Sequence, residues 1–112
     1  SSAASDVYKR QELEISLMQI ISYSGEARSL CFEALQSYRD GDKEAGRKQY
    51  KDAEENLYTA KRAHSRILKQ SANGEFDQIS LLMVHAEDQM MASEIIYQMT
   101  RELFHCMSET KG

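Results

Sequence analysis

The feature that most constrains this fold is a regular spacing of apolar and small residues in the first third of the chain. These residues follow one another at alternating steps of four and three, which places them on one face of a long helix. They are Leu13, Leu17, Ile20, Ser24, Ala27, Cys31, Ala34 and Tyr38. The chain has no proline and only 5 glycines among its 112 residues, so strong helix breakers are rare. We predict one helix of about thirty residues that starts near Val7 and ends at the run Arg39-Asp40-Gly41-Asp42.

A second helix with the same spacing follows a short turn. Gly41 suits the left-handed conformation that ends a helix, and Asp42 can cap the next one. The face predicted to pack comprises Gly46, Tyr50, Ala53, Leu57, Ala60, His64 and Ile67. The other faces carry a dense set of charged side chains, which is typical of a solvated surface. A turn pattern at residues 71–75, Ser-Ala-Asn-Gly-Glu, ends this helix.

The third helix differs from the others because it carries two apolar faces. It begins between Phe76 and Ser80, with Ser80 as a candidate N-cap. The first face comprises Leu82, His85, Gln89, Ala92, Ile96, Met99, Leu103 and Cys106, and the second comprises Leu81, Val84, Asp88, Met91, Ile95, Gln98 and Glu102. A helix in a monomeric bundle needs one broad apolar stripe, so the second face indicates contact with another chain. We expect oligomerisation through this helix.

Two short turns between three long helices predict an all-α protein, an antiparallel three-helix up-down bundle. The length suits one domain, which we assign to residues 7–112. Residues 1–6 are small, polar and without periodicity, and we expect them to be a disordered terminus or a remnant of cloning.

The charge and hydropathy exclude several classes of protein. A net charge of −4 and a pI near 5.4 leave no basic face for nucleic acid or for an anionic membrane. The longest uncharged run, residues 15–25, is too short to span a bilayer, and we expect no secretory signal because no basic stretch precedes an apolar segment. We therefore expect a cytoplasmic protein. Cys31 and Cys106 belong to no metal-binding pattern and are interpreted as reduced, buried thiols without a function.

The candidate chemistry lies in the third helix. His85, Asp88 and Gln89 are spaced i, i+3 and i+4, so they lie on one side of the helix within about one turn. A lone histidine on an apolar face is more often structural, and we interpret His64 and His105 in that way. Beside Asp88 and Gln89, however, His85 becomes a candidate nucleophile, because a neutral imidazole nitrogen can attack phosphorus.

Asp88 presents a separate problem because its neighbours on the second face are apolar. If that face packs around a symmetry axis, copies of the carboxylate converge and must either take up protons or bind a shared cation. An oxygen-only site of this kind would suit Mg²⁺ or Ca²⁺. The alternatives are that Asp88 faces water at the edge of the bundle, or that it only fixes the register of an oligomer.

Two motifs carry a resemblance to a known family. The runs are Ser24 to Leu30, SGEARSL, and Ser80 to Ala86, SLLMVHA, followed by Asp88. With them the chain resembles the lactose/cellobiose/chitobiose-type enzyme IIA component of the bacterial phosphoenolpyruvate-dependent sugar phosphotransferase system, from about Glu12 to Glu109. No glycine-rich phosphate loop, nucleophile elbow or H-E-x-x-H motif competes with this assignment.

The resemblance implies a homotrimer of three-helix bundles in which His85 accepts a phosphoryl group from the phosphohistidine of HPr. The group then passes to a cysteine of a cognate IIB component for sugar uptake. The resemblance also implies that Asp88 from each subunit coordinates a shared metal, usually Mg²⁺, on the trimer axis. The family's usual Q-D-H reads Glu87-Asp88-Gln89 here, so an amide replaces a histidine one turn after His85. We expect Gln89 to support the phosphoryl group or the imidazole.

Three functions remain open from the sequence. The first is the phosphoryl carrier, a phosphotransferase component with His85 as acceptor. The second is a catalytically silent helical interaction or regulatory module that keeps the IIA fold, as the changes at Glu87 and Gln89 would allow. The third is an oligomeric bundle in which Asp88 sets register alone. The sugar cannot be named, because in such systems the membrane component recognises it.

Overall fold

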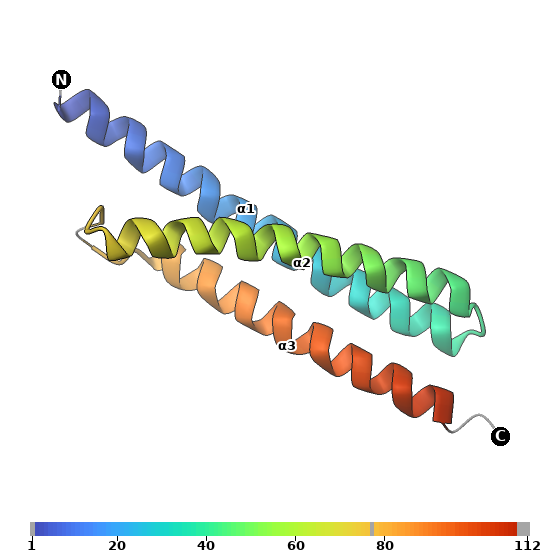
Figure 1. The fold of residues 1–112 in the computed structure, drawn as a ribbon. Coiled ribbons are helices and arrows are strands. Elements are labelled where there is room, and N and C mark those ends of the chain that lie inside the picture. The colour runs from blue at the N-terminus through green and yellow to red at the C-terminus, as the bar shows by residue number, and fades with distance from the viewer. Residues whose placement is uncertain (1, 77, 110–112) are drawn as a thin grey trace.

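The computed structural model describes residues 2–76 and 78–109, with the backbone alone at residues 2 and 109. It contains three helices: α1 (Ser2–Arg39), α2 (Lys43–Ala72) and α3 (Leu81–Glu109). They run up, down and up in a rod with extents of 68 × 19 × 19 Å, and the two ends of the chain lie at opposite ends of it (Figure 1). The described residues form no strand, so the predicted all-α three-helix bundle is confirmed. No helix among them is long and apolar enough to cross a membrane.

The helix boundaries follow the predicted local signals. Gly41 has a φ of 94°, in the left-handed region that favours glycine. The Asp42 side chain accepts a hydrogen bond from the backbone N–H of Ala45 at 3.1 Å and so caps α2. Ser80 caps α3 in the same way, because its Oγ accepts from the backbone N–H of Met83 at 3.1 Å.

The start of α1 differs from the prediction. The helix begins at Ser2 and includes residues that we expected to be disordered. Ala3 and Ala4 favour helix strongly, and no glycine or proline separates them from the rest of α1. Side chains 3–12 are all exposed, so this first part of α1 lacks a packed face. Residues 1 and 110–112 of the predicted domain boundaries lie outside the described part of the chain.

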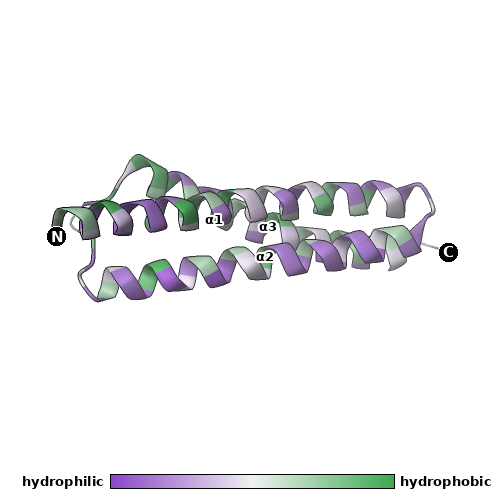
Figure 2. Ribbon diagram, turned by 90° about the horizontal axis from the view of Figure 1, so that it is seen from above, coloured by the Kyte–Doolittle hydropathy of each residue, from purple (hydrophilic) through white to green (hydrophobic). Residues whose placement is uncertain are grey.

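The predicted faces of α1 and α2 form the core. Every residue of the two predicted faces is buried or half-buried. Small residues dominate the contact, and Ala27, Ala34, Ala53 and Ala60 have no exposed surface. At Gly46 the helices approach so closely that a Cβ would lie 3.0 Å from the carbonyl oxygen of Ala34. Hydrophilic residues cover much of α2, as Figure 2 shows, so its apolar stripe is narrow.

The packed face of α3 is not the one predicted. The buried residues are Ala86, Met90, Ser93, Tyr97 and Thr100, whereas His85, Ala92, Met99, Leu103 and Cys106 of the predicted first face are exposed. The prediction was wrong because it weighted large apolar residues. Small side chains let α3 approach α1 closely. The buried hydroxyl groups of α3 are hydrogen-bonded. Ser93 Oγ donates to the carbonyl oxygen of Ser24 at 2.8 Å, and Thr100 Oγ1 donates to the carbonyl oxygen of Ile96 at 2.7 Å.

The second predicted face of α3 lies on the outside of the chain. It is an apolar stripe, interrupted by Asp88, whose main members are Leu81, Val84, Met91 and Ile95; their exposed fractions run from 44% to 84%. Below we call these four residues and Asp88 the outer stripe. So much exposed apolar surface along one helix is unusual for a monomer.

The two cysteines differ from each other. Cys31 is buried in the core, where burial raises the pKa of its thiol, in keeping with an inert structural residue. Cys106 is exposed, which corrects the prediction that both thiols are buried.

Candidate functional site

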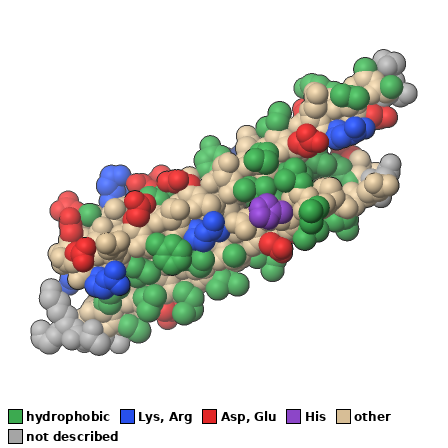
Figure 3. All heavy atoms as spheres, turned by 180° about the vertical axis from the view of Figure 1, so that it is seen from behind, with side chains coloured by type: hydrophobic (Ala, Val, Ile, Leu, Met, Phe, Trp, Pro, Cys, Tyr) green, Lys and Arg blue, Asp and Glu red, His purple; other side chains and the backbone are tan. Residues whose placement is uncertain are grey.

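His85 lies one turn into α3, on the border between the packed face and the outer stripe. Ser80 caps the helix start and thereby fixes the turn that carries the imidazole. The side chain is exposed and makes no hydrogen bond to another described residue. Figure 3 shows one histidine on the drawn face, with hydrophobic side chains and an acidic side chain beside it. An exposed imidazole on a helix can react with a group carried by another protein.

Gln89 lies one turn beyond His85 and is held from α1. The guanidinium nitrogen Nη1 of Arg28 donates to Oε1 of Gln89 at 2.8 Å. Both side chains are half-buried. The structure thus brings the two motifs of the sequence together, since Arg28 belongs to SGEARSL and Gln89 follows SLLMVHA. Arg28 was not among the predicted site residues; only its place inside the first motif pointed to it.

Glu87 turns away from His85. Its carboxylate pairs with the imidazole Nε2 of His64 on α2. This contact joins α2 to α3 and satisfies His64, which confirms that histidine as a structural residue of the bundle. Because Glu87 and His85 are two residues apart on a helix, their side chains point to different sides.

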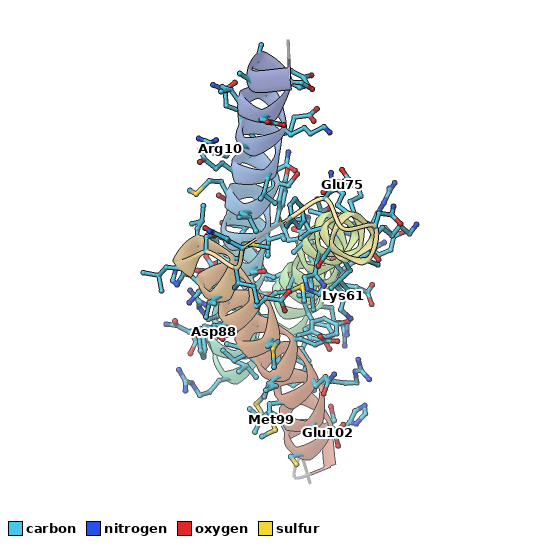
Figure 4. All side chains as sticks on the ribbon, turned by 90° about the vertical axis from the view of Figure 1, so that its left-hand side faces the viewer. Arg10, Lys61, Glu75, Asp88, Met99 and Glu102 are labelled. Carbon is cyan, nitrogen blue, oxygen red and sulfur yellow. The ribbon has the colours of Figure 1, made fainter. Side chains whose placement is uncertain are left out.

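Asp88 lies on the outer stripe. Figure 4 labels it on the side of α3 that faces away from α2. Its side chain is exposed, and it forms no ion pair with the described residues. No group of three histidine, cysteine or acidic side chains in the described part of the chain could hold a metal ion. One chain alone therefore offers a cation a single carboxylate here.

A network of polar contacts joins the middle of α2 to the middle of α3. Tyr97 donates to Glu54 at 2.8 Å, and its ring stacks on Tyr50 with centroids 4.6 Å apart. Burial, followed by hydrogen bonds to Tyr50 and Glu54, raises the pKa of Tyr97 above its usual range. Lys61 pairs with Glu94 at 2.6 Å. These contacts fasten α3 to α2, and they place no group near His85.

A family model decides the identity of the chain. The model described as "PTS system, Lactose/Cellobiose specific IIA subunit" matches residues 15–108. The chain belongs to this family. The IIA chain is therefore a component of the sugar phosphotransferase system, and the resemblance drawn from its two motifs is confirmed.

Relatives and solved structures agree with this assignment. The IIA chain is 34% identical over 105 residues to the lichenan-specific phosphotransferase enzyme IIA component of Bacillus subtilis, covering 91% of this chain and 96% of that one. It is 30% identical to the N,N'-diacetylchitobiose-specific EIIA component of Escherichia coli, with 91% and 88% covered. The crystal structure of the cellobiose-specific enzyme IIA from Bacillus anthracis matches with a TM-score of 0.82 at 29% identity, over 89% of this chain and 94% of that one.

Proposed function

We propose that this IIA is a phosphoryl carrier and that His85 is the residue that carries the phosphate. The observation behind the proposal is the exposed imidazole of His85, which lies inside the second motif on a capped helix and is engaged by no described neighbour. A ring nitrogen with a free lone pair is the nucleophile that phosphoryl transfer between histidines requires.

The proposed exchange conserves its atoms and protons. A neutral ring nitrogen of His85 attacks the phosphorus of phosphohistidine in HPr, and the phosphorus–nitrogen bond of the donor breaks. The leaving imidazole of HPr takes up a proton, and the other ring nitrogen of His85 gives one up. The phosphoryl group then moves to the thiolate of a cysteine in a cognate IIB component, which serves uptake of a sugar of the lactose/cellobiose/chitobiose class. Both exchanges take place in the cytoplasm.

The outer stripe is the proposed contact between subunits of a homotrimer. Burying Leu81, Val84, Met91 and Ile95 against copies of themselves would remove their exposed apolar surface from water. Three copies of Asp88 would then converge on the axis. Their carboxylates form the oxygen-only donor set that Mg²⁺ takes, and the ion would offset their mutual repulsion. The apolar neighbours of Asp88 favour this arrangement over isolated hydration of the carboxylate.

Association measurements test the trimer and its metal. Light scattering of the wild type should give a trimer that is weakened by a chelator, because unscreened carboxylates repel. Asp88→Leu should give a trimer that ignores the chelator. If neither the chelator nor the substitution changes association, Asp88 does not bind metal at an interface.

Transfer from phosphorylated HPr tests the carrier function. We expect the wild type to take up acid-labile phosphate and His85→Ala to take up none. His64→Ala and His105→Ala are the matched controls and should still be labelled. A label that persists in His85→Ala would overturn the site. If the wild type takes up no phosphate and instead binds a transporter or regulator, the silent interaction module is the better account.

A further inference from the structure

Arg28 is the one described arginine that bridges α1 and the helix carrying His85 through a side-chain hydrogen bond. Arg28 is half-buried as a residue. The ion pairs among the described residues, Lys48–Asp52, Lys61–Glu94 and His64–Glu87, do not include it. The one hydrogen bond the structure gives it ends on a neutral amide oxygen. A half-buried cation without a counter-ion is costly, which suits a place where an anion arrives during function.

Gln89 connects that cation to His85. Helical side chains lean towards the N-terminus of their helix, so we expect the Gln89 amide to lie over the turn that carries His85. The hydrogen bond from Arg28 occupies Oε1 at 2.8 Å. This hydrogen bond therefore fixes the orientation of the amide. The hydrogens on Nε2 remain available as donors on the side of the amide away from Arg28. No described residue accepts from Nε2 of Gln89.

We propose that Arg28 is a positioning residue for phosphoryl transfer. It holds the Gln89 amide so that Nε2 donates to a phosphoryl oxygen on His85, and it places a positive charge behind that donor. In this chain an amide stands where the family usually has a second histidine, and the Arg28–Gln89 pair takes over support of the phosphoryl group. The inference rests on the proposed carrier function.

The test is the equilibrium between phosphorylated HPr and this IIA, measured for wild type, Arg28→Met and Arg28→Lys. Because charge-assisted hydrogen bonds are roughly twice as strong as neutral ones, we expect Arg28→Met to shift the equilibrium about tenfold towards HPr. Arg28→Lys, which retains a charged donor, should recover most of this loss. The phosphorus NMR shift of phosphorylated His85 should change in Arg28→Met and be restored in Arg28→Lys.

Arg47→Met is the matched control. Arg47 is exposed on the first turns of α2, at the end of the rod opposite to the start of α3, and its loss changes the net charge equally. We expect it to leave the equilibrium and the NMR shift unchanged. Thermal unfolding of each variant separates loss of fold from loss of phosphoryl support.

Coupling to Gln89 decides whether Arg28 acts through the amide. In a Gln89→Ala background, Arg28→Met should change the equilibrium less than about twofold, because the positioned group is gone. An undiminished effect in that background, or an Arg28→Met protein that matches Arg47→Met, would overturn the positioning role while the carrier function stands. A wild type that takes up no phosphate would overturn both.

Discussion

The two sides of α3 are built on opposite principles. The packed side combines Met90 and Tyr97 with small and hydroxyl-bearing residues: Ala86, Ser93 and Thr100 each have an exposed fraction of 1%. The outer stripe uses large apolar residues that remain open to water. Small residues let two helices of one chain approach closely, whereas large apolar residues gain from burial only when a partner covers them. One side of α3 thus holds the bundle together, and the other side leaves large apolar residues exposed on the single chain.

Two neighbouring methionines test this contrast most strongly. Met90 is 6% exposed on the packed side, and Met91 is 55% exposed on the outer stripe. We expect Met90→Ala to lower the free energy of unfolding by about 2–5 kcal/mol, because it leaves a cavity in the core. Met91→Ala should change the unfolding of a single chain by less than about 0.5 kcal/mol. Chemical denaturation at concentrations below association measures both, and equal losses would remove the distinction.

The hydroxyl groups of the packed side provide a finer test. Ser93→Ala removes the buried hydrogen bond to the carbonyl oxygen of Ser24 and should cost about 1 kcal/mol of unfolding free energy. Ser29→Ala, at an exposed position of α1, is the control and should cost less than about 0.5 kcal/mol. Denaturant midpoints compare them. A Ser93→Ala protein as stable as the control would show that side-chain size alone, without the hydrogen bond, sets the packing.

The smallest expected effect is at Glu87, which lies two residues from the proposed phosphoryl acceptor His85 and yet pairs with His64 of α2. Glu87→Gln breaks the ion pair between Glu87, whose side chain is 43% exposed, and His64, whose side chain is 17% exposed. We expect the free energy of unfolding to fall by less than about 1 kcal/mol. The rate of phosphate uptake from phosphorylated HPr should be unchanged, and a quenched time course of the transfer would measure it. A marked rise in that rate would mean that the Glu87 charge reaches the site and opposes the phosphoryl group.

Local rules predicted most of the fold. The spacing of four and three residues gave the packed faces of α1 and α2, and Gly41, Asp42 and Ser80 fixed the turns because each has a distinct backbone or capping role. The packed face of α3 could not be predicted in this way. Apart from Met90, its buried residues are small or polar, and they stabilise the bundle only because α1 packs against them, which depends on tertiary structure.

Some residues of the candidate site could be predicted from the sequence, and one could not. His85 and Asp88 could be selected from the sequence because imidazole and carboxylate groups are conspicuous on an apolar helix. Arg28 could not, because the sequence does not show which neighbouring helix a long arginine side chain on α1 reaches. The hydrogen bond to Gln89, across 61 positions of sequence, emerges only when α1 and α3 are packed together.

The most direct test of a carrier is whether it gives up what it has received. The isolated phosphorylated protein should be mixed with a cognate IIB component, and the phosphate on each protein followed over time. We predict that phosphate leaves His85 and appears on a cysteine of IIB faster than phosphohistidine hydrolyses alone. Phosphate that stays on this chain until it is hydrolysed, with every candidate IIB, would contradict the account.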